Sequence, residues 1–343
     1  MFVVRPAALA DIDALEAMAK VSMPGVHTLP RTREKIAASV ERSMASFAAH
    51  VDIPSEESYL FVLEQRATGA IAGTAAIHAS AGSNGTYFSF RNDVIQQVSR
   101  DLNVSHSVHA LTLCSELTAY SQLSGFYIAD QARAGAEAAL LSRARLLFAV
   151  LAPHRFSDRF FVPLAGVTDK HGQSPFWEAL GRKFFQMDFL DAERIIGGAR
   201  NRTLIVELMP HYPVYVPLLP GDAQAVMGQI HAGGELAFSL LTAEGFEADD
   251  YVDIFDGGPI LQAHKNALRS FSGSLVRHVA QAEPGRSADP LANYAIAASN
   301  EQNFRAITVS CPAVESDDCV QLSDEARRAL MVAPGDSVIC VRI

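Results

Sequence analysis

The stretch that decides the fold is GFYIADQARAGAEAALLSRARLLFAVLA, residues 125–152. Its first five residues, GFYIA (125–129), are apolar and aromatic, which predicts a strand. Behind a short turn, apolar residues recur at helical spacing over residues 131–152. These are Leu140, Ala144, Leu147, Phe148 and Leu151. The stretch therefore predicts a strand that runs through a small-residue turn into a long helix.

The residues before this stretch predict a strand, two helices and a hairpin. Residues 2–5 are a short β-type run, and Asp11 can cap the helix that follows. A second helical pattern covers residues 36–47. Strands are expected at 59–64 and 71–79, joined by a glycine-containing turn. The N-terminal order is therefore strand, helix, helix, strand, strand.

The intervening and following segments are less regular. A polar segment at 80–103 interrupts the pattern, and residues 108–114 are compatible with a further strand. Another strand is expected at 160–167. The string SPFWEALGRKFF (174–185) predicts a short capped helix that stops at Gly181 and is followed by a strand.

Composition and pattern divide the chain into three parts. Residues 1–200 are expected to form the main domain, and residues 201–280 a second, smaller half. Pro, Gly, Ser and charged residues accumulate just after residue 280, which is typical of a linker. Residues 281–343 therefore form the linker and a small C-terminal αβ appendage, with a strand, a short helix, a Pro-Gly-Asp turn and a strand at its end.

Composition excludes several classes of protein. Of 343 residues, 49% are hydrophobic and 19% charged, so a sizeable core can form. A net charge of −10 argues against binding to a nucleic-acid backbone. No apolar run reaches the roughly 18 residues of a membrane helix, and the first 15 residues do not have the pattern of a secretory signal, so we expect neither feature. The 4 cysteines show no metal-ligand spacing, so we expect no metal site and a reducing, cytoplasmic compartment.

The predicted order of elements resembles that of the GNAT-type N-acyltransferases. The resemblance implies an α+β fold with a mixed, mostly antiparallel sheet and flanking helices. It also implies an acyl-CoA whose pantetheine lies beside the central strand and whose pyrophosphate lies at the N-terminus of the long helix. Arg133, Ala136 and Ala138 stand where the family has Arg-x-x-Gly-x-Gly/Ala. An ordinary alanine-rich helix start explains the same residues equally well.

Longer strings make the resemblance specific. They are Val4-Arg5-Pro6, SYLFVLE (58–64), SPFWEALGRKFF (174–185), ELMPHYPVYVPLLP (207–220), GQIH (228–231) and YVDIFDGGP (251–259). With these strings the chain resembles the arginine N-succinyltransferase family, in particular its alpha-type subunits. The resemblance implies transfer of a succinyl group from succinyl-CoA to the α-amine of L-arginine, or of ornithine. It also implies a beta-type paralogous subunit or self-association.

The resemblance places the catalytic and donor-binding residues. His231, in the Gly-Gln-x-His string, matches the proton donor proposed for the family, and an imidazole can serve as general acid or base near neutral pH. A histidine that only caps a helix end is the alternative. Phe126 falls on a succinyl-CoA contact of the family, and Ile128 lies on the same strand. Core packing is the alternative for Phe126.

Three carboxylates are candidates for binding the cationic acceptor. Glu116, Asp253 and Asp256 could each pair with a guanidinium through two hydrogen bonds. Asp253 and Asp256 flank a Gly-Gly turn, however, where aspartates often accept hydrogen bonds from nearby backbone N–H groups. Both interpretations stay open at this point.

Two departures from the family pattern define a second function hypothesis. Ala136 and Ala138 replace a cleaner Gly-x-Gly, and the string ELTA (116–119) replaces an Asp-His-Thr-Gly run. Both changes affect the side of the protein that would bind acyl-CoA. The chain is therefore either a succinyltransferase or a non-catalytic GNAT-like subunit that stabilises or regulates a beta-type partner.

Overall fold

The computed structural model describes residues 1–21, 32–83, 85–129, 135–192, 207–281, 290–298, 303–315 and 317–343. The N-terminal elements are β1 (Phe2–Pro6), α1 (Ile12–Val21), α2 (Arg33–Ala48), β2 (Ser58–Gln65), β3 (Ala70–His78), β4 (Ser89–Ser99), β5 (Val104–Cys114), β6 (Ser121–Ile128), α3 (Ala136–Leu151) and β7 (Arg159–Pro163). The central elements are α4 (Pro175–Ala179), α5 (Gly181–Phe185), α6 (Phe189–Ala192), β8 (Val214–Tyr215), α8 (Gly221–Val226), α9 (Glu235–Glu244), β9 (Glu247–Val252), β10 (Pro259–His264) and α10 (Arg269–Ser272). The C-terminal elements are β11 (Leu275–Gln281), β12 (Leu291–Ala298), β13 (Arg305–Pro312), β14 (Cys319–Leu322), α11 (Asp324–Leu330) and β15 (Ser337–Arg342).

The strands of the described residues form one mixed sheet. Its order is β14-β11-β15-β12-β13-β1-β2-β3-β6-β7-β10-β9-β4-β5-β8. Among these neighbours, only β6 with β7 and β11 with β14 run parallel. The α+β fold with a mostly antiparallel sheet and flanking helices is therefore confirmed.

Helix α3 forms the centre of the main core. Its apolar residues pack against β2 and β3 and also against β12 and β13. The Phe148 ring is surrounded by those of Phe47, Phe61 and Phe304, with centroids 5.1–5.7 Å away. This helix therefore connects the N-terminal strands to the C-terminal ones through buried aromatic contacts.

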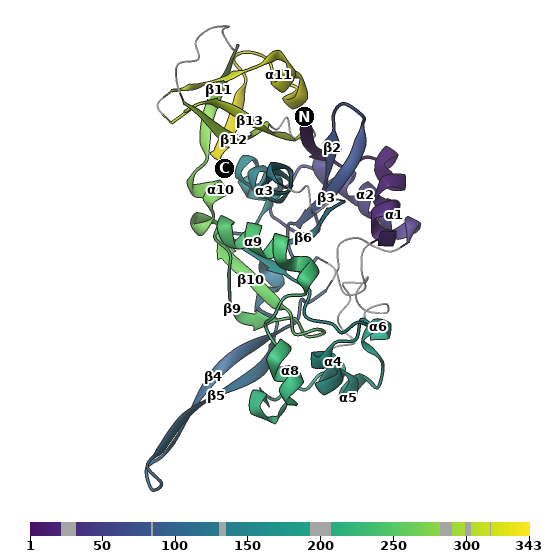
Figure 1. The fold of residues 1–343 in the computed structure, drawn as a ribbon, viewed down its shortest axis with the longest axis vertical. Coiled ribbons are helices and arrows are strands. Elements are labelled where there is room, and N and C mark those ends of the chain that lie inside the picture. The colour runs from purple at the N-terminus through teal and green to yellow at the C-terminus, as the bar shows by residue number, and fades with distance from the viewer. Residues whose placement is uncertain are drawn as a thin grey trace.

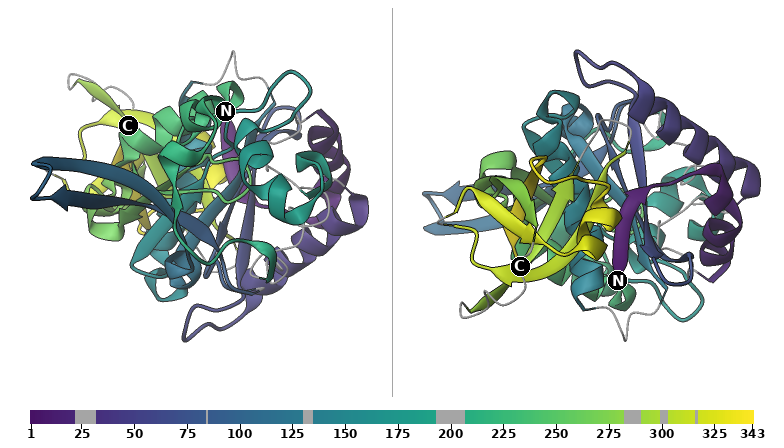
Figure 2. Two further views of the ribbon diagram at one scale, coloured as in Figure 1. Left: turned by 90° about the horizontal axis from the view of Figure 1, so that it is seen from below. Right: turned by 90° about the horizontal axis from the view of Figure 1, so that it is seen from above.

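Helices α1 and α2 cover the opposite face of β2 and β3. Leu15 of α1 and Val40 of α2 pack with Leu60 and Val62 of β2 in a separate apolar cluster. In both views of Figure 2, these helices and the C-terminal strands lie on opposite sides of the molecule. Strand β13 pairs with β1 through Val4 and Ala306, so the C-terminal strands extend the same sheet.

Strands β4 and β5 form a long hairpin, here called the arm, that projects from the body of the molecule (Figure 1). They pair continuously from Ser89–Cys114 to Ser99–Val104. The prediction that residues 80–103 only interrupt the fold is therefore wrong for residues 89–99. Because both faces of the arm are largely exposed, its sequence lacks the apolar and polar alternation that identifies a half-buried strand.

The string SPFWEALGRKFF is also partly corrected. Ser174 caps α4, because its hydroxyl accepts a hydrogen bond from the Trp177 N–H at 3.2 Å, as predicted. Residues after Gly181 form helix α5, however, and not a strand. A Cβ atom on Gly181 would lie 2.2 Å from the Trp177 ring. This glycine is therefore needed for close packing against the indole and does not end the helical structure.

Candidate active site

The parallel strands β6 and β7 separate soon after they begin. They pair only at Ser121 with Phe160 and at Gln122 with Phe161 among the described residues. Beyond Gln122, β6 stays paired with β3 on its other side, up to Ile128. We call this region, β6 beyond Gln122 and β7 beyond Phe161, the strand fork. It leaves one backbone edge of β6 without a strand neighbour in the described part of the chain.

A bulge distorts β6 within the fork. The register between β3 and β6 shifts between Thr74 and Ala76, opposite Gly125. Gly125 has φ of +59°, a conformation that costs little only for glycine. The bulge re-aims the backbone on both sides of Gly125, which is a common feature beside active sites.

His231 lies just beyond the end of β7. Its backbone N–H donates to the Ala165 carbonyl at 2.8 Å, and Ile230 forms an isolated bridge with Gly166. The ring is half-buried, and its Nδ1 accepts a hydrogen bond from the Gly233 N–H at 3.0 Å. A neutral ring that accepts at Nδ1 carries its proton on Nε2. The ring is therefore set to donate a hydrogen bond from Nε2.

The start of α3 follows directly from the fork. Gly135 is the N-cap residue, and no side chain of the described residues caps the helix. Ala136 is exposed at the first helical position, whereas Ala138 is fully buried in the core. Only the backbone of Ala138 could therefore contact a ligand. Arg133, the predicted phosphate ligand, lies outside the described residues.

The two predicted donor contacts on β6 have different surroundings. Phe126 is half-buried, and its ring centroid lies 5.6 Å from Cζ of Arg145. Ile128 is 5% exposed and packs in the main core. Phe126 therefore keeps a surface for a ligand, while Ile128 can contribute chiefly its backbone.

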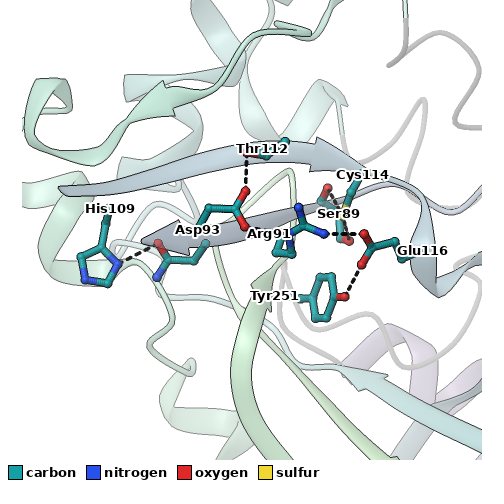
Figure 3. Close-up of polar contacts among 9 residues, drawn as sticks. Ser89, Arg91, Asp93, His109, Thr112, Cys114, Glu116 and Tyr251 are labelled. Atoms are coloured by element: carbon teal, nitrogen blue, oxygen red, sulfur yellow. Dashed lines mark hydrogen bonds and ion pairs between the residues drawn. The ribbon is translucent and has the colours of Figure 1, made fainter. Parts of the chain in front are cut away.

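Glu116 lies at the base of the arm, in a short 3-10 turn over Glu116–Ala119. Figure 3 shows its carboxylate between Arg91 and Tyr251, and both of its oxygens accept hydrogen bonds from them. Burial, and then the adjacent carboxylate, raises the pKa of the Tyr251 hydroxyl. A cationic substrate at Glu116 would have to compete with the Arg91 guanidinium. Its role in substrate binding stays a prediction.

Asp253 and Asp256 support a buried turn. Asp256 accepts from the Gly166 N–H at 2.8 Å and from the Gly258 N–H at 2.9 Å, and it is 2% exposed. Asp253 accepts from the Phe255 N–H at 2.8 Å. These contacts favour the turn interpretation over substrate binding, which stays untested. Asp256 also fixes Gly166, which follows the residue that accepts the hydrogen bond of His231.

Arg145 of α3 is not among the site residues predicted from the sequence. Its side chain is 1% exposed and lies beneath the bulge of β6, next to Phe126 and Ser124. A signal was present, because Arg145 interrupts the helical stripe formed by Leu141 and Phe148. An arginine within an apolar stripe is a buried charge that needs an explanation.

The described residues contain no group of three or more His, Cys, Asp or Glu side chains that could hold a metal ion. Among the same residues, no helix is long and apolar enough to span a membrane.

Comparisons with known proteins match this chain to arginine N-succinyltransferases. The family model described as "Arginine N-succinyltransferase beta subunit" matches residues 2–270. Arginine N-succinyltransferase subunit alpha of Pseudomonas aeruginosa is 43% identical over 343 residues, covering 100% of each chain. Arginine N-succinyltransferase of Escherichia coli (strain 55989 / EAEC) is 33% identical over 344 residues, covering 100% of this chain and 98% of its own.

A solved structure agrees as well. It is titled as arginine/ornithine succinyltransferase subunit AI from Pseudomonas aeruginosa, and it matches with a TM-score of 0.89 and 40% identity. The match covers 100% of this chain and 98% of that chain. The resemblance inferred from the sequence strings is confirmed over the full length. The chain therefore belongs to the arginine N-succinyltransferase family of acyltransferases.

Proposed function

We propose that this protein transfers the succinyl group of succinyl-CoA to the α-amine of L-arginine, as a step of arginine catabolism. Its similarity over the whole chain to relatives named arginine N-succinyltransferase, at 43% and 33% identity, carries this proposal. The strand fork supports it, because an open strand edge suits an extended thioester with amide groups.

The donor would bind along β6 and at α3. The amides of pantetheine would hydrogen-bond to the open edge of β6, as an added strand does. The pyrophosphate would lie at the N-terminus of α3, where backbone N–H groups and the helix dipole favour anions. Ala136 leaves room there for a close approach, and Arg133 would pair with a phosphate. Phe126 would contact the acyl end.

The chemistry is direct attack of the neutral α-amine on the thioester carbonyl. A C–N bond forms, a tetrahedral oxyanion develops, and a backbone N–H of β6 near the bulge would stabilise it. The C–S bond then breaks, and the departing thiolate of CoA needs a proton. The nitrogen that has attacked must in turn lose a proton, and we assign both transfers to His231: the ring takes up a proton at Nδ1, which releases the Gly233 N–H, and the imidazolium then gives its Nε2 proton to the thiolate. His231 therefore acts as general base and then as general acid.

The protein would work with a second subunit. The relatives named subunit alpha and subunit AI are parts of a multi-subunit enzyme by their names. A beta-type paralogue would be the partner, or a second copy of this chain. The alternative function, a non-catalytic subunit that stabilises or regulates a beta-type chain, has two bases in the sequence: Ala136 and Ala138 in place of glycines, and ELTA (116–119) in place of an Asp-His-Thr-Gly run.

The test is release of free CoA thiol from succinyl-CoA by the purified chain. Arginine, ornithine and a control without amine would be compared. Release that depends on arginine supports the proposal, and the ratio to ornithine ranks the acceptors. If thiol appears only after a beta-type chain is added, and His231→Ala in this chain does not slow it, the non-catalytic alternative replaces the proposal.

A further inference from the structure

Arg145 is a buried cation that no carboxylate of the described residues neutralises. Its Nε donates to the Ser142 carbonyl at 3.1 Å, and Nη2 donates to the Ser142 hydroxyl at 2.9 Å. Its Nη1 donates to the Ser124 carbonyl at 3.4 Å. All three acceptors are neutral, and they engage only part of the five N–H donors of a guanidinium.

Burial of such a charge is unfavourable without an anion. Burial lowers the pKa of the Arg145 guanidinium to about 9, so the group still carries its charge at neutral pH. An apolar side chain could occupy the same space, as Leu141 and Phe148 do at neighbouring positions of the same helix face. The charge therefore points to an anion that is bound during function.

Three arginines elsewhere in the described residues, by contrast, have carboxylate partners. Arg5 pairs with Asp11 and Glu64. Arg91 and Arg182 each pair with two carboxylates as well. Arg155 is also buried, but it donates to two backbone carbonyls at the C-terminal end of α2. The C-terminal end of a helix favours a positive charge, so this arginine is stabilised without a carboxylate.

Arg145 lies close to the place where the acyl group of the donor is proposed to bind. Ser124 and Phe126, its neighbours on β6, stand on either side of Gly125 at the bulge. The proposed function places the thioester at this bulge. A succinyl group ends in a carboxylate two methylene carbons beyond the thioester carbonyl, and Phe126 is the half-buried side chain that lies over the guanidinium.

We propose that Arg145 binds the terminal carboxylate of the succinyl group and thereby selects a dicarboxylic acyl donor. This inference rests on the proposed function. Movement of the Phe126 ring would admit the carboxylate, and the guanidinium would replace its bonds to neutral acceptors with charge-assisted bonds.

The experiment compares two acyl donors with Arg145→Met. Succinyl-CoA and butyryl-CoA have four-carbon acyl chains, but only succinyl-CoA carries the terminal carboxylate. We expect the ratio of kcat/KM for succinyl-CoA to that for butyryl-CoA to fall by about 10²–10³-fold in the variant. The ratio is independent of the folded fraction, because both donors are measured in one preparation of the active form, with its partner subunit where activity requires it.

Two further variants keep the test decisive. Arg143→Met, on the same helix, removes an arginine paired with Glu244 and should leave the ratio unchanged. Arg145→Lys, which keeps the charge but loses the guanidinium fork, should give an intermediate ratio, and it serves if Arg145→Met does not fold. Equal losses with both donors, or a wild-type protein that does not prefer succinyl-CoA, would overturn the assignment. Failure of the proposed function would differ, because the wild-type protein would then transfer no acyl group to arginine.

Discussion

The strand fork and the arm both consist of two neighbouring strands, but they distribute their hydrogen bonds and side chains in opposite ways. In the arm, β4 and β5 stay paired over their whole length, while Val94, Val98 and Leu102 are 60–75% exposed. In the fork, β6 and β7 pair at only two positions within the described residues, while the side chains beneath them are buried against α3.

The difference shows how the edge of a strand can lack a hydrogen-bonded neighbour while the strand stays in place. One edge of β6 can lack a strand neighbour among the described residues because α3 and its aromatic cluster pack against the strands. The arm has no such support beyond its base and depends on backbone pairing, which alone gives a two-stranded ribbon marginal stability. Chemistry should therefore depend on the fork, and stability of the whole molecule should be insensitive to the arm.

The largest contrast should be catalytic. His231→Ala should lower turnover by about 10²–10⁴-fold, because it removes the proton donor for the CoA thiolate. His109→Ala is the matched variant, since His109 lies on the arm and bonds to Asn92. It should leave turnover unchanged in the thiol-release assay. Equal effects of the two substitutions would remove the distinction between fork and arm.

The next contrast concerns stability. Phe148→Ala should reduce the free energy of unfolding by about 3–5 kcal/mol, because it leaves a cavity among buried rings. Val98→Ala, on the exposed arm, should change it by less than about 0.5 kcal/mol. Urea unfolding of both variants measures the difference. A loss above about 2 kcal/mol for Val98→Ala would show that the arm is packed against something in solution.

Backbone conformation gives a smaller contrast. Gly125 in the fork and Asn103 at the tip of the arm both have positive φ, +59° and +50°. Gly125→Ala should cost about 1–2 kcal/mol and should also raise the KM for succinyl-CoA, because the bulge would shift. Asn103→Gly should be nearly neutral on both measures. An unchanged KM in Gly125→Ala would separate the bulge from donor binding.

The smallest effect concerns the ion pairs at the base of the arm. The hydrogen bond from Arg91, with a further one from Thr112, lowers the pKa of Asp93. The pair should therefore stabilise the folded state above the ordinary aspartate pKa and lose this effect as the pH falls through the lowered pKa. Asp93→Asn should cost about 0.2–1 kcal/mol at pH 7, and nothing at a pH below that pKa. Thermal unfolding of the wild-type protein and of Asp93→Asn at several pH values measures both stabilities, which should become equal at low pH.

The sequence by itself determined the elements whose signals are local. Apolar periodicity in residues 131–152 predicts the helix that became α3, and the alternation near 59–79 predicts the hairpin β2–β3. Ser174 is recognisable as a cap because capping involves only the next three residues. The long strings around His231 identify the family, although they do not show which atoms the ring contacts.

Only the tertiary structure decided features that depend on distant contacts. Gly181 reads as a helix stop, but the Trp177 ring requires its missing Cβ. Arg145 reads as one charge on a long helix, and only the fold places it under the β6 bulge with no carboxylate of the described residues beside it. The separation of β6 from β7 likewise depends on long-range pairing. The pattern of apolar residues within one helix or strand shows which of its side chains are buried. It does not show which distant residue will pair with a buried charge or with the edge of a strand, because that residue comes from another part of the chain.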